Sequence, residues 1–322
     1  MSPNNAGPGV ATATEPPREP ASYHGQPILK APVWSKEVPN YLFVGGLAGA
    51  SATLAYTAEL SGAEELSRRA WLTASAGIMA CPPLLIIDLG RPERFLNMLR
   101  MFKVTSPMSM GSWILSVSGA TTALAGFNVV SGRLAVPALV ARPVGGVFGL
   151  LLATYTAALF ADTAVPAWHE ARHELPFVFG AGAALSAAGA VSAATPARQA
   201  APARRLAVGA AVAELASTAI MERRLGFQAG AYGHGRARAL KWMSRACVAA
   251  GPGLLATAGV RSRAAAVAGG ALACAGALAT RWSVFEAGRA SVADPRYVVE
   301  PQRARMAARA EHRHQSSRSA SV

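Results

Sequence analysis

The sequence predicts an all-α integral membrane protein with eight transmembrane helices. Of its 322 residues, 52% are hydrophobic and only 15% are charged, whereas a soluble domain carries about a quarter charged residues. The charged residues gather in short runs, separated by long stretches that hold one charge or none. Such a layout is typical of helices that cross a lipid bilayer, where each segment must satisfy its own backbone hydrogen bonds.

Eight apolar blocks account for most of the chain, and each is about 17–23 residues long. As a helix, a block of that length crosses a hydrocarbon layer of ~30 Å. The fifth block, "FGAGAALSAAGAVSAA", consists mostly of small residues, which let helix backbones approach closely, so we expect it inside the bundle. The blocks cover approximately residues 40–60, 70–89, 111–131, 144–165, 175–195, 204–221, 243–260 and 264–283.

The two ends of the chain are polar and differ from the apolar blocks. Residues 1–33 are rich in Pro, Ala and Gly and lack the pattern of a cleavable signal peptide, so we expect a disordered tail. Residues 286–322 form a basic tail, which we expect to be solvated; a basic interfacial helix is the alternative. An even number of spans places both termini on one side. Most of the 31 Lys and Arg residues fall on that side, which predicts cytoplasmic termini.

Composition also argues against several classes of protein. The net charge is +14, but the basic residues lie between apolar blocks with few aromatic residues among them, so they indicate membrane flanks and not nucleic-acid binding. The three cysteines lie in apolar stretches without metal-ligand spacing. None of the six histidines is deep in a span. A membrane haem is held by axial ligands such as histidine, so we expect neither haem nor an iron–sulfur cluster in this chain.

The loops on the two faces of the predicted bundle differ in kind. Those on the side opposite the termini are short and plain. Those on the terminal side are longer and carry aromatic residues, prolines and paired charges; they cover residues 34–41, 88–113, 161–177 and 221–242. In the second of these, residues 92–102 can form an amphipathic helix on the membrane surface, with a connecting loop as the alternative. The asymmetry predicts that the terminal face receives a partner or ligand.

Ionisable residues within membrane depth are costly and tend to be functional. Four acids qualify: Glu59, Asp88, Asp162 and Glu214. Asp88 and Asp162 end the second and fourth blocks near the terminal face, and Tyr155 lies seven residues before Asp162 on the same helical face. For each acid, the alternative is a carboxylate that simply pairs with an arginine of a loop.

Four stretches carry a resemblance to a known family: "VWSKEVPNYLFVGGLAGA", "IIDLGRPERFLNML", "SPMSMGSW" and "ADTAVPAWHEARHELPFVF". Together they resemble the membrane subunits of the NrfD/polysulfide reductase family over about residues 33–180. The resemblance implies a haem-free membrane domain over residues 34–285, built as two packed four-helix bundles, about 34–165 and 175–285. It also implies that the first bundle holds a site where electrons pass to or from quinone, either menaquinone or ubiquinone, as an exchangeable substrate.

The resemblance further implies partners and site residues. The partners would be a four-cluster, ferredoxin-like iron–sulfur subunit and a molybdopterin catalytic subunit, docked on the terminal face as in polysulfide reductase or formate dehydrogenase. Asp88 and Asp162 would handle protons. The residues expected to contact or flank the quinone are Asn40, Tyr155, Arg91, Trp34 and His169.

Two other functions compete with the quinone-reactive subunit. A pure anchor would have the docking face but no quinone pocket, and would tolerate changes at these positions. An ion or solute transporter would need a midplane site shared by matching halves. The helix-breaking motifs, at Cys81-Pro82-Pro83 and Gly251-Pro252-Gly253, fall in the second and seventh blocks and do not match between halves.

Overall fold

The computed structural model describes residues 28–89 and 96–319, and all regular structure in these ranges is helical. Eight helices in these ranges are long, and the described connections between them contain short turns, the one-turn helix α5 (Pro166–Glu170) and short 3-10 segments. A further helix, α10 (Arg296–Ser319), follows them. The long helices are α1 (Glu37–Leu60), α2 (Glu64–Leu89), α3 (Pro107–Ser131), α4 (Ala135–Ala161), α6 (Leu175–Ala194), α7 (Ala201–Leu225), α8 (Gly235–Ala256) and α9 (Arg263–Ala293).

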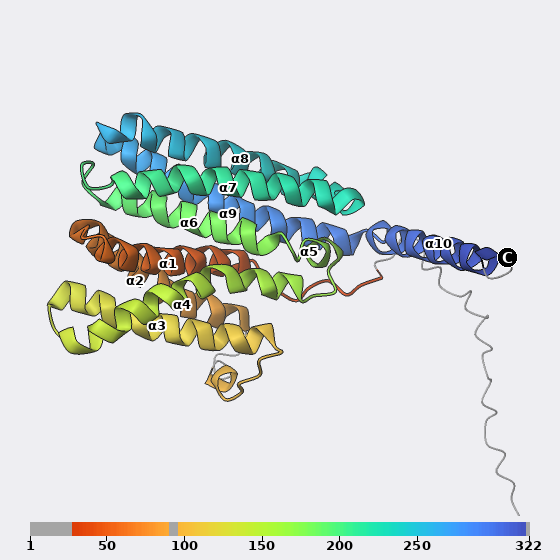
Figure 1. Ribbon diagram of the computed structural model, residues 1–322, viewed down its shortest axis with the longest axis horizontal. Coiled ribbons are helices and arrows are strands. Elements are labelled where there is room, and N and C mark those ends of the chain that lie inside the picture. Colours follow the sequence, from red (N-terminus) through yellow and green to blue (C-terminus); the bar gives the residue numbers. More distant parts are fainter. Residues whose placement is uncertain (1–27, 90–95, 320–322) are drawn as a thin grey trace, which may run out of the picture.

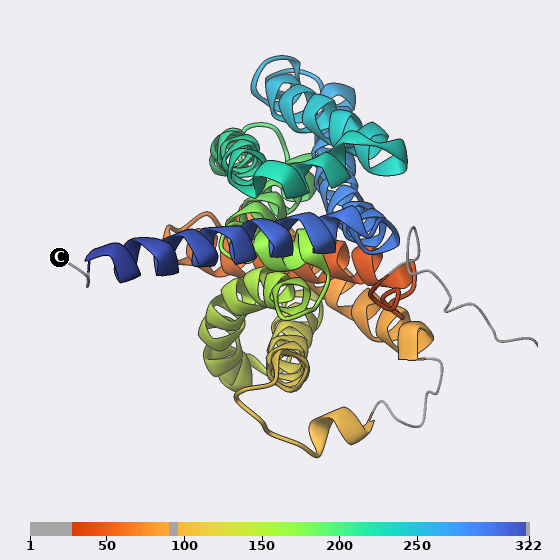
Figure 2. The same cartoon turned by 90° about the vertical axis from the view of Figure 1, so that its right-hand side faces the viewer.

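The long helices lie side by side in two groups (Figures 1 and 2). The first group contains α1 to α4, and the second contains α6 to α9; within each group, helices that follow one another are in contact. Helices α1 and α4 of the first group pack against α6 of the second, and α1 also touches α9. The seam between the groups is therefore built mainly from α1, α4 and α6, with a smaller part from α9.

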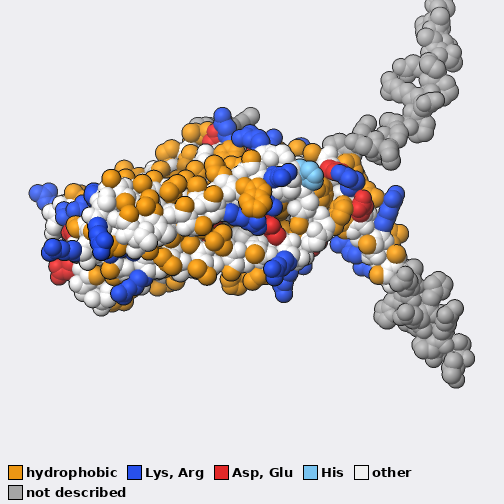
Figure 3. Space-filling model, turned by 90° about the horizontal axis from the view of Figure 1, so that it is seen from above, with side chains coloured by type: hydrophobic (Ala, Val, Ile, Leu, Met, Phe, Trp, Pro, Cys, Tyr) orange, Lys and Arg blue, Asp and Glu red, His pale blue; other side chains and the backbone are white. Residues whose placement is uncertain are grey.

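The turns fall at two ends of the assembly (Figure 1). We call the end formed by residues 28–36, 96–106, 162–174 and 226–234 the terminal face, because α1 starts there and α9 ends there. The opposite face is formed by residues 61–63, 132–134, 195–200 and 257–262. Along the flank on the α8 side, apolar and small side chains cover the length between the ends, and most Lys and Arg side chains gather toward the ends (Figure 3).

Among the described residues, five helices are long and apolar enough to cross a membrane: α2, α3, α4, α6 and α9. The prediction of an all-helical, multi-pass membrane protein is thereby confirmed, whereas the number of eight spans stays a prediction. Of the five, α6 is the most enclosed, with 61% of its most apolar window buried. This agrees with the expectation that its run of small residues lies inside the bundle.

Several helices extend past the predicted apolar blocks and include charged residues that lie near the block ends. Helix α4 starts at Ala135, α8 starts at Gly235, and α9 ends at Ala293. The part of α4 that precedes the predicted block contains Arg142. The Arg142 guanidinium binds the Glu59 carboxylate of α1 at 2.6 Å and the Asn128 side chain of α3 at 2.7 Å. For Glu59, the alternative of a carboxylate paired with an arginine is therefore confirmed.

Glycine permits the closest approach between α1 and α4. A Cβ placed on Gly49 would collide with the backbone oxygen of Gly149, and a Cβ on Gly149 would collide with that of Gly49. Thr53 reinforces the contact, because its hydroxyl donates to the Gly146 carbonyl at 2.7 Å. Backbones that meet this closely leave little room for a side chain between them.

Two segments outside the bundle differ from the sequence predictions. The surface helix predicted over residues 92–102 is, in its described part, a single 3-10 turn at Leu96–Leu99 (η2) followed by irregular chain. Residues 90–95 lie outside the described residues. At the other end of the chain, α10 is helical and projects away from the bundle beyond the terminal face (Figure 1).

Candidate functional site

A cavity of about 90 Å³ opens among α1, α2, α3 and α4 near the terminal face. Its walls are mostly apolar, and we call it the polar cavity because Asp88 and two tyrosines also line it. Three of the residues predicted for the site, Trp34, Asp88 and Tyr155, line it together. They come from positions far apart in the sequence, and the packing of the first helix group brings them to one place. The other lining residues are Val38, Tyr41, Leu85, Leu89, Met108, Gly111, Ser112, Leu115 and Leu159.

Asp88 holds the segment that precedes α1. Its Oδ1 atom accepts a hydrogen bond from the Ser35 backbone N–H at 3.0 Å and another from the Ser35 hydroxyl at 2.5 Å. Hydrogen bonds to an ionised carboxylate are stronger than neutral ones. The carboxyl group therefore fastens the segment before α1 over the cavity, and it also forms part of the cavity wall.

Two tyrosines face each other across the cavity. The hydroxyl groups of Tyr41 on α1 and Tyr155 on α4 are hydrogen-bonded to one another. The Tyr155 ring lies against Gly111 of α3, where any Cβ would overlap the ring. Tyr41 and Gly111 were not singled out from the sequence. The sequence could relate Tyr155 only to residues of its own helix, such as Asp162. The contacts of Tyr155 with Tyr41 and Gly111 depend on how α1 and α3 are rotated toward α4.

Aromatic rings cover the cavity on the terminal face. The Trp34 ring stacks on Trp168 with 5.3 Å between ring centroids, and it meets the edge of Phe160 at the same separation. Trp168 is fully buried, and its indole N–H donates to the Val284 carbonyl on α9 at 2.7 Å. The cover of the cavity is thereby fastened to the second helix group.

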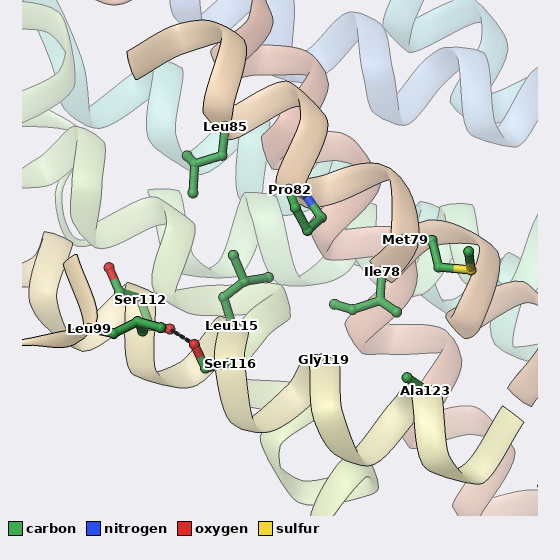
Figure 4. Close-up of a pocket in the computed structure, with 10 residues that line it drawn as sticks. All are labelled: Ile78, Met79, Pro82, Leu85, Leu99, Ser112, Leu115, Ser116, Gly119 and Ala123. Atoms are coloured by element: carbon green, nitrogen blue, oxygen red, sulfur yellow. Dashed lines mark hydrogen bonds between the residues drawn. The ribbon is translucent and has the colours of Figure 1, made fainter. Parts of the chain in front are cut away.

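A larger, apolar cleft lies beside the polar cavity, between α2 and α3 (Figure 4). Its volume is about 290 Å³, and it shares Leu85, Ser112 and Leu115 with the polar cavity. Its remaining lining residues are Ile78, Met79, Pro82, Leu99, Ser116, Gly119 and Ala123. Together, the two spaces reach the lower end of the roughly 300–1,000 Å³ that is typical of small-molecule sites.

The serines of the cleft direct their hydrogen bonds into their own helix. The Ser112 hydroxyl donates to the Met108 carbonyl at 2.9 Å. The Ser116 hydroxyl donates to the Ser112 carbonyl at 2.7 Å, the bond that Figure 4 marks with a dashed line. The cleft therefore presents an almost wholly apolar surface. A ligand that fits both spaces needs a compact polar end for the cavity and a flexible apolar chain for the cleft.

The other predicted site residues lie elsewhere or outside the described residues. The Asn40 side chain accepts a hydrogen bond from the Trp282 indole of α9 at 3.0 Å and does not line the polar cavity. Asp162 caps the end of α4, and His169 lies on α5; both are exposed at the terminal face. Arg91 lies outside the described residues. The roles predicted for these four stay predictions.

Among the described residues, no group of three or more His, Cys, Asp or Glu side chains is placed to hold a metal ion. The chemistry that the polar cavity can perform with its own side chains is proton exchange, since it offers one carboxyl group and two phenols within a helix bundle.

A multi-pass helical membrane protein with a cavity at one face that carries a carboxyl group and two tyrosines, beside an apolar cleft, is the class that this fold and site define. A sequence model of the NrfD-type polysulfide reductase family matches residues 21–296. The chain therefore belongs to the polysulfide reductase family, whose members are membrane subunits of polysulfide-reductase-like complexes. A search of curated protein sequences finds no match.

Proposed function

We propose that this chain is the quinone-reactive membrane subunit of a multi-subunit oxidoreductase. In this role it passes electrons between a partner iron–sulfur subunit, which works with a molybdopterin catalytic subunit, and the quinone pool of the membrane. The observation that carries the proposal is the polar cavity with Asp88 and two tyrosines, continued by the apolar cleft. A quinone has the matching form, with a ring that carries two carbonyl oxygens and a long isoprenoid tail.

The proposed reaction assigns protons to this chain and electrons to its partner. Reduction of a quinone takes two electrons, which would arrive from the partner's clusters, and two protons, which join the two carbonyl oxygens. Asp88 would deliver a proton to one oxygen, and the hydrogen-bonded Tyr41 and Tyr155 would orient the ring and deliver the second proton to the other oxygen. Water at the terminal face would return one proton to Asp88 and one to the tyrosine pair. Oxidation of a quinol uses the same groups in reverse.

The proposal includes an arrangement in the membrane. All eight long helices would cross the bilayer as two four-helix bundles, α1 to α4 and α6 to α9. The terminal face would be cytoplasmic and would receive the iron–sulfur subunit next to the aromatic cover of the cavity. The longer loops on that face, and the greater number of Lys and Arg residues there, support this orientation.

The direct test is electron transfer in the intact complex. The complex is purified by a tag on this chain, its clusters are reduced, and their paramagnetic resonance signals are followed after a quinone analogue is added. We expect the clusters to be reoxidised, and we expect the chain alone to show no cluster signal. Clusters that stay reduced in a fully assembled complex would identify the chain as an anchor without quinone chemistry.

The apolar cleft can be tested separately with quinones of different tail length. A Cβ on Gly119 would lie 3.7 Å from Ile78, so the backbone accepts a side chain there, and the rest of a leucine would fill the cleft. We expect Gly119→Leu to raise the KM of a long-tailed quinone about tenfold, equivalent to about 1.4 kcal/mol of lost binding. A tailless analogue should be unaffected.

The matched control is Gly209→Leu. Gly209 is an exposed residue of α7, where an added Cβ would meet nothing within 4 Å. This variant should leave the KM of both quinones unchanged. Equal changes for the long-tailed and tailless quinones in Gly119→Leu would place the tail elsewhere.

A further inference from the structure

The second helix group buries two ionisable side chains that the proposed quinone chemistry does not use. Glu214 of α7 and Arg281 of α9 are each only 1% exposed. Both lie in the interior of helices within the bundle. Ionisable groups at such positions are energetically costly, and in membrane proteins they often mark a path for protons or ions.

Arg281 is held firmly at the seam between the two helix groups. Its guanidinium donates to the carbonyls of Leu42 on α1 at 3.4 Å, Phe179 on α6 at 3.0 Å and Ala277 on α9 at 2.8 Å. It also lies over the Phe179 ring, 5.4 Å from the ring centroid. These contacts come from three helices and fix the positive charge in place.

Glu214 faces this charge but uses only one of its oxygens. Its Oε1 atom accepts a hydrogen bond from the Thr280 hydroxyl at 2.5 Å, and Thr280 also bonds to Ser244 of α8 at 2.6 Å. The Oε2 atom is buried without a hydrogen-bond partner. Gly182 of α6 leaves room for the two head groups beside it. A Cβ added to Gly182 would lie 2.8 Å from Arg281 Nη1 and 3.2 Å from Glu214 Oε1.

A small cavity connects Glu214 with charged residues nearer the terminal face. Its volume is about 20 Å³, and it is lined by residues of α7, α8, α9 and the 3-10 segment η3 (Gly226–Gly233). Two of its lining residues, Glu214 and Tyr232, each have a buried oxygen without a hydrogen-bond partner. A space of this size can hold one water molecule, and such a water would satisfy these oxygens.

The same cavity reaches an ion triplet with access to solvent. Glu222 of α7 pairs with Lys241 at 3.5 Å and with Arg245 at 2.9 Å, both on α8. The side chains of these three residues are between 16% and 31% exposed. They belong to the cavity lining together with Glu214, so a route leads from solvent through the triplet to the buried carboxyl group.

We propose that Glu214 is a proton-binding carboxyl group, reached from the terminal face through this water-sized cavity, with Arg281 as its fixed counter-charge. In the binding step, the Oε2 atom accepts a proton from the cavity water, which recovers one from bulk water past the ion triplet; no electron moves. The other titratable groups that face the cavity are Tyr232 of η3, Glu222 of α7, and Lys241 and Arg245 of α8. Helix α6 places Gly182 against the Glu214 head group. The site is independent of the quinone proposal.

The test is infrared difference spectroscopy of the full chain in lipid nanodiscs, recorded without quinone while the pH is changed. We expect the wild type to show a protonated-carboxyl C=O band that titrates and that is absent from Glu214→Gln. Glu59→Gln is the matched control, because the Glu59 carboxyl group also lies next to an arginine of another helix, Arg142, and this variant should keep the band. A band that persists in Glu214→Gln would overturn the proposal.

Two further variants test the route and guard against misfolding. Thr218 lines the cavity, and Thr218→Phe should fill it and slow hydrogen–deuterium exchange of the band at least tenfold. Unchanged exchange would overturn the proposed route. Should Glu214→Gln fail to fold, Glu214→Asp retains the carboxyl group on a shorter side chain, and it must shift the band; an unshifted band would assign it to another residue.

Discussion

Replacing Asp88 by Asn is expected to lower quinone-linked turnover of the intact complex about 100-fold or more while the complex still assembles. The loss of a positioned acid–base group typically costs 10²–10⁴-fold in rate. The amide oxygen of Asn can still accept both hydrogen bonds from Ser35, so the segment before α1 should remain in place. Turnover is measured with a quinone analogue, and assembly by co-purification of the partner subunits.

The Asp162→Asn variant shows which of the two acids predicted to handle protons, Asp88 or Asp162, is needed for turnover. Asp162 is exposed at the end of α4 and does not line the polar cavity. Its replacement should therefore leave turnover within about twofold of the wild type. The opposite ranking, with Asp162→Asn inactive and Asp88→Asn active, would move the proton-exchanging site out of the polar cavity to the terminal surface.

Replacing Trp168 by Ala is expected to lower the free energy of unfolding by about 3–5 kcal/mol, the usual cost of truncating a buried Trp or Phe. Trp168 is fully buried between Trp34, Phe160 and Phe285, and a Cβ on Gly288 of α9 would overlap its ring. The change also removes the support of Trp34, so the KM for quinone should rise. Denaturant unfolding of the purified chain in detergent measures the first effect, and steady-state kinetics of the complex measures the second.

Two further variants give reference values for the loss of stability in Trp168→Ala. Trp168→Phe keeps aromatic packing but loses the hydrogen bond to the Val284 carbonyl, which should cost about 1 kcal/mol for the bond itself. Trp113→Ala removes a tryptophan that is 37% exposed near the terminal face, and it should cost clearly less than Trp168→Ala. Equal losses for Trp113→Ala and Trp168→Ala would mean that burial against α9 adds nothing to stability.

Part of the candidate site could be predicted from the sequence. Asp88 and Trp34 were chosen because they lie in the family stretches, next to the ends of apolar blocks. Tyr155 was chosen because it lies seven residues before Asp162 and because the resemblance implies a polar quinone contact there. All three line one cavity. Asn40 was chosen in the same way, yet it points to Trp282 of α9 while its neighbour Tyr41 lines the cavity. Adjacent residues on a helix point about 100° apart, so only the rotation of α1 within the bundle decides between them.

The ends of the helices, like the site, could be predicted from the sequence only in part. The predicted blocks left out Arg142 and Lys241, but α4 includes the first and α8 the second. The blocks did include Arg245 and Arg281, and α9 continues past the predicted end at residue 283 to Ala293. These side chains are compatible with long helices because neighbouring helices supply their partners: Glu59 for Arg142, Glu222 for Lys241 and Arg245, and backbone carbonyls for Arg281. A pairing between distant segments cannot be read from hydropathy, which averages over neighbours along the chain.

The sequence by itself determined that this protein is helical and enters a membrane, because hydrophobicity and the need to satisfy backbone hydrogen bonds act locally along each segment. Through the family stretches, it also predicted that the candidate site lies at the terminal face. Only the tertiary structure decided which side chains share a cavity, that an apolar cleft continues it, and that Glu214 faces Arg281 across Gly182. Those features depend on how helices far apart in the sequence rotate and approach, and packing contacts between them set that geometry.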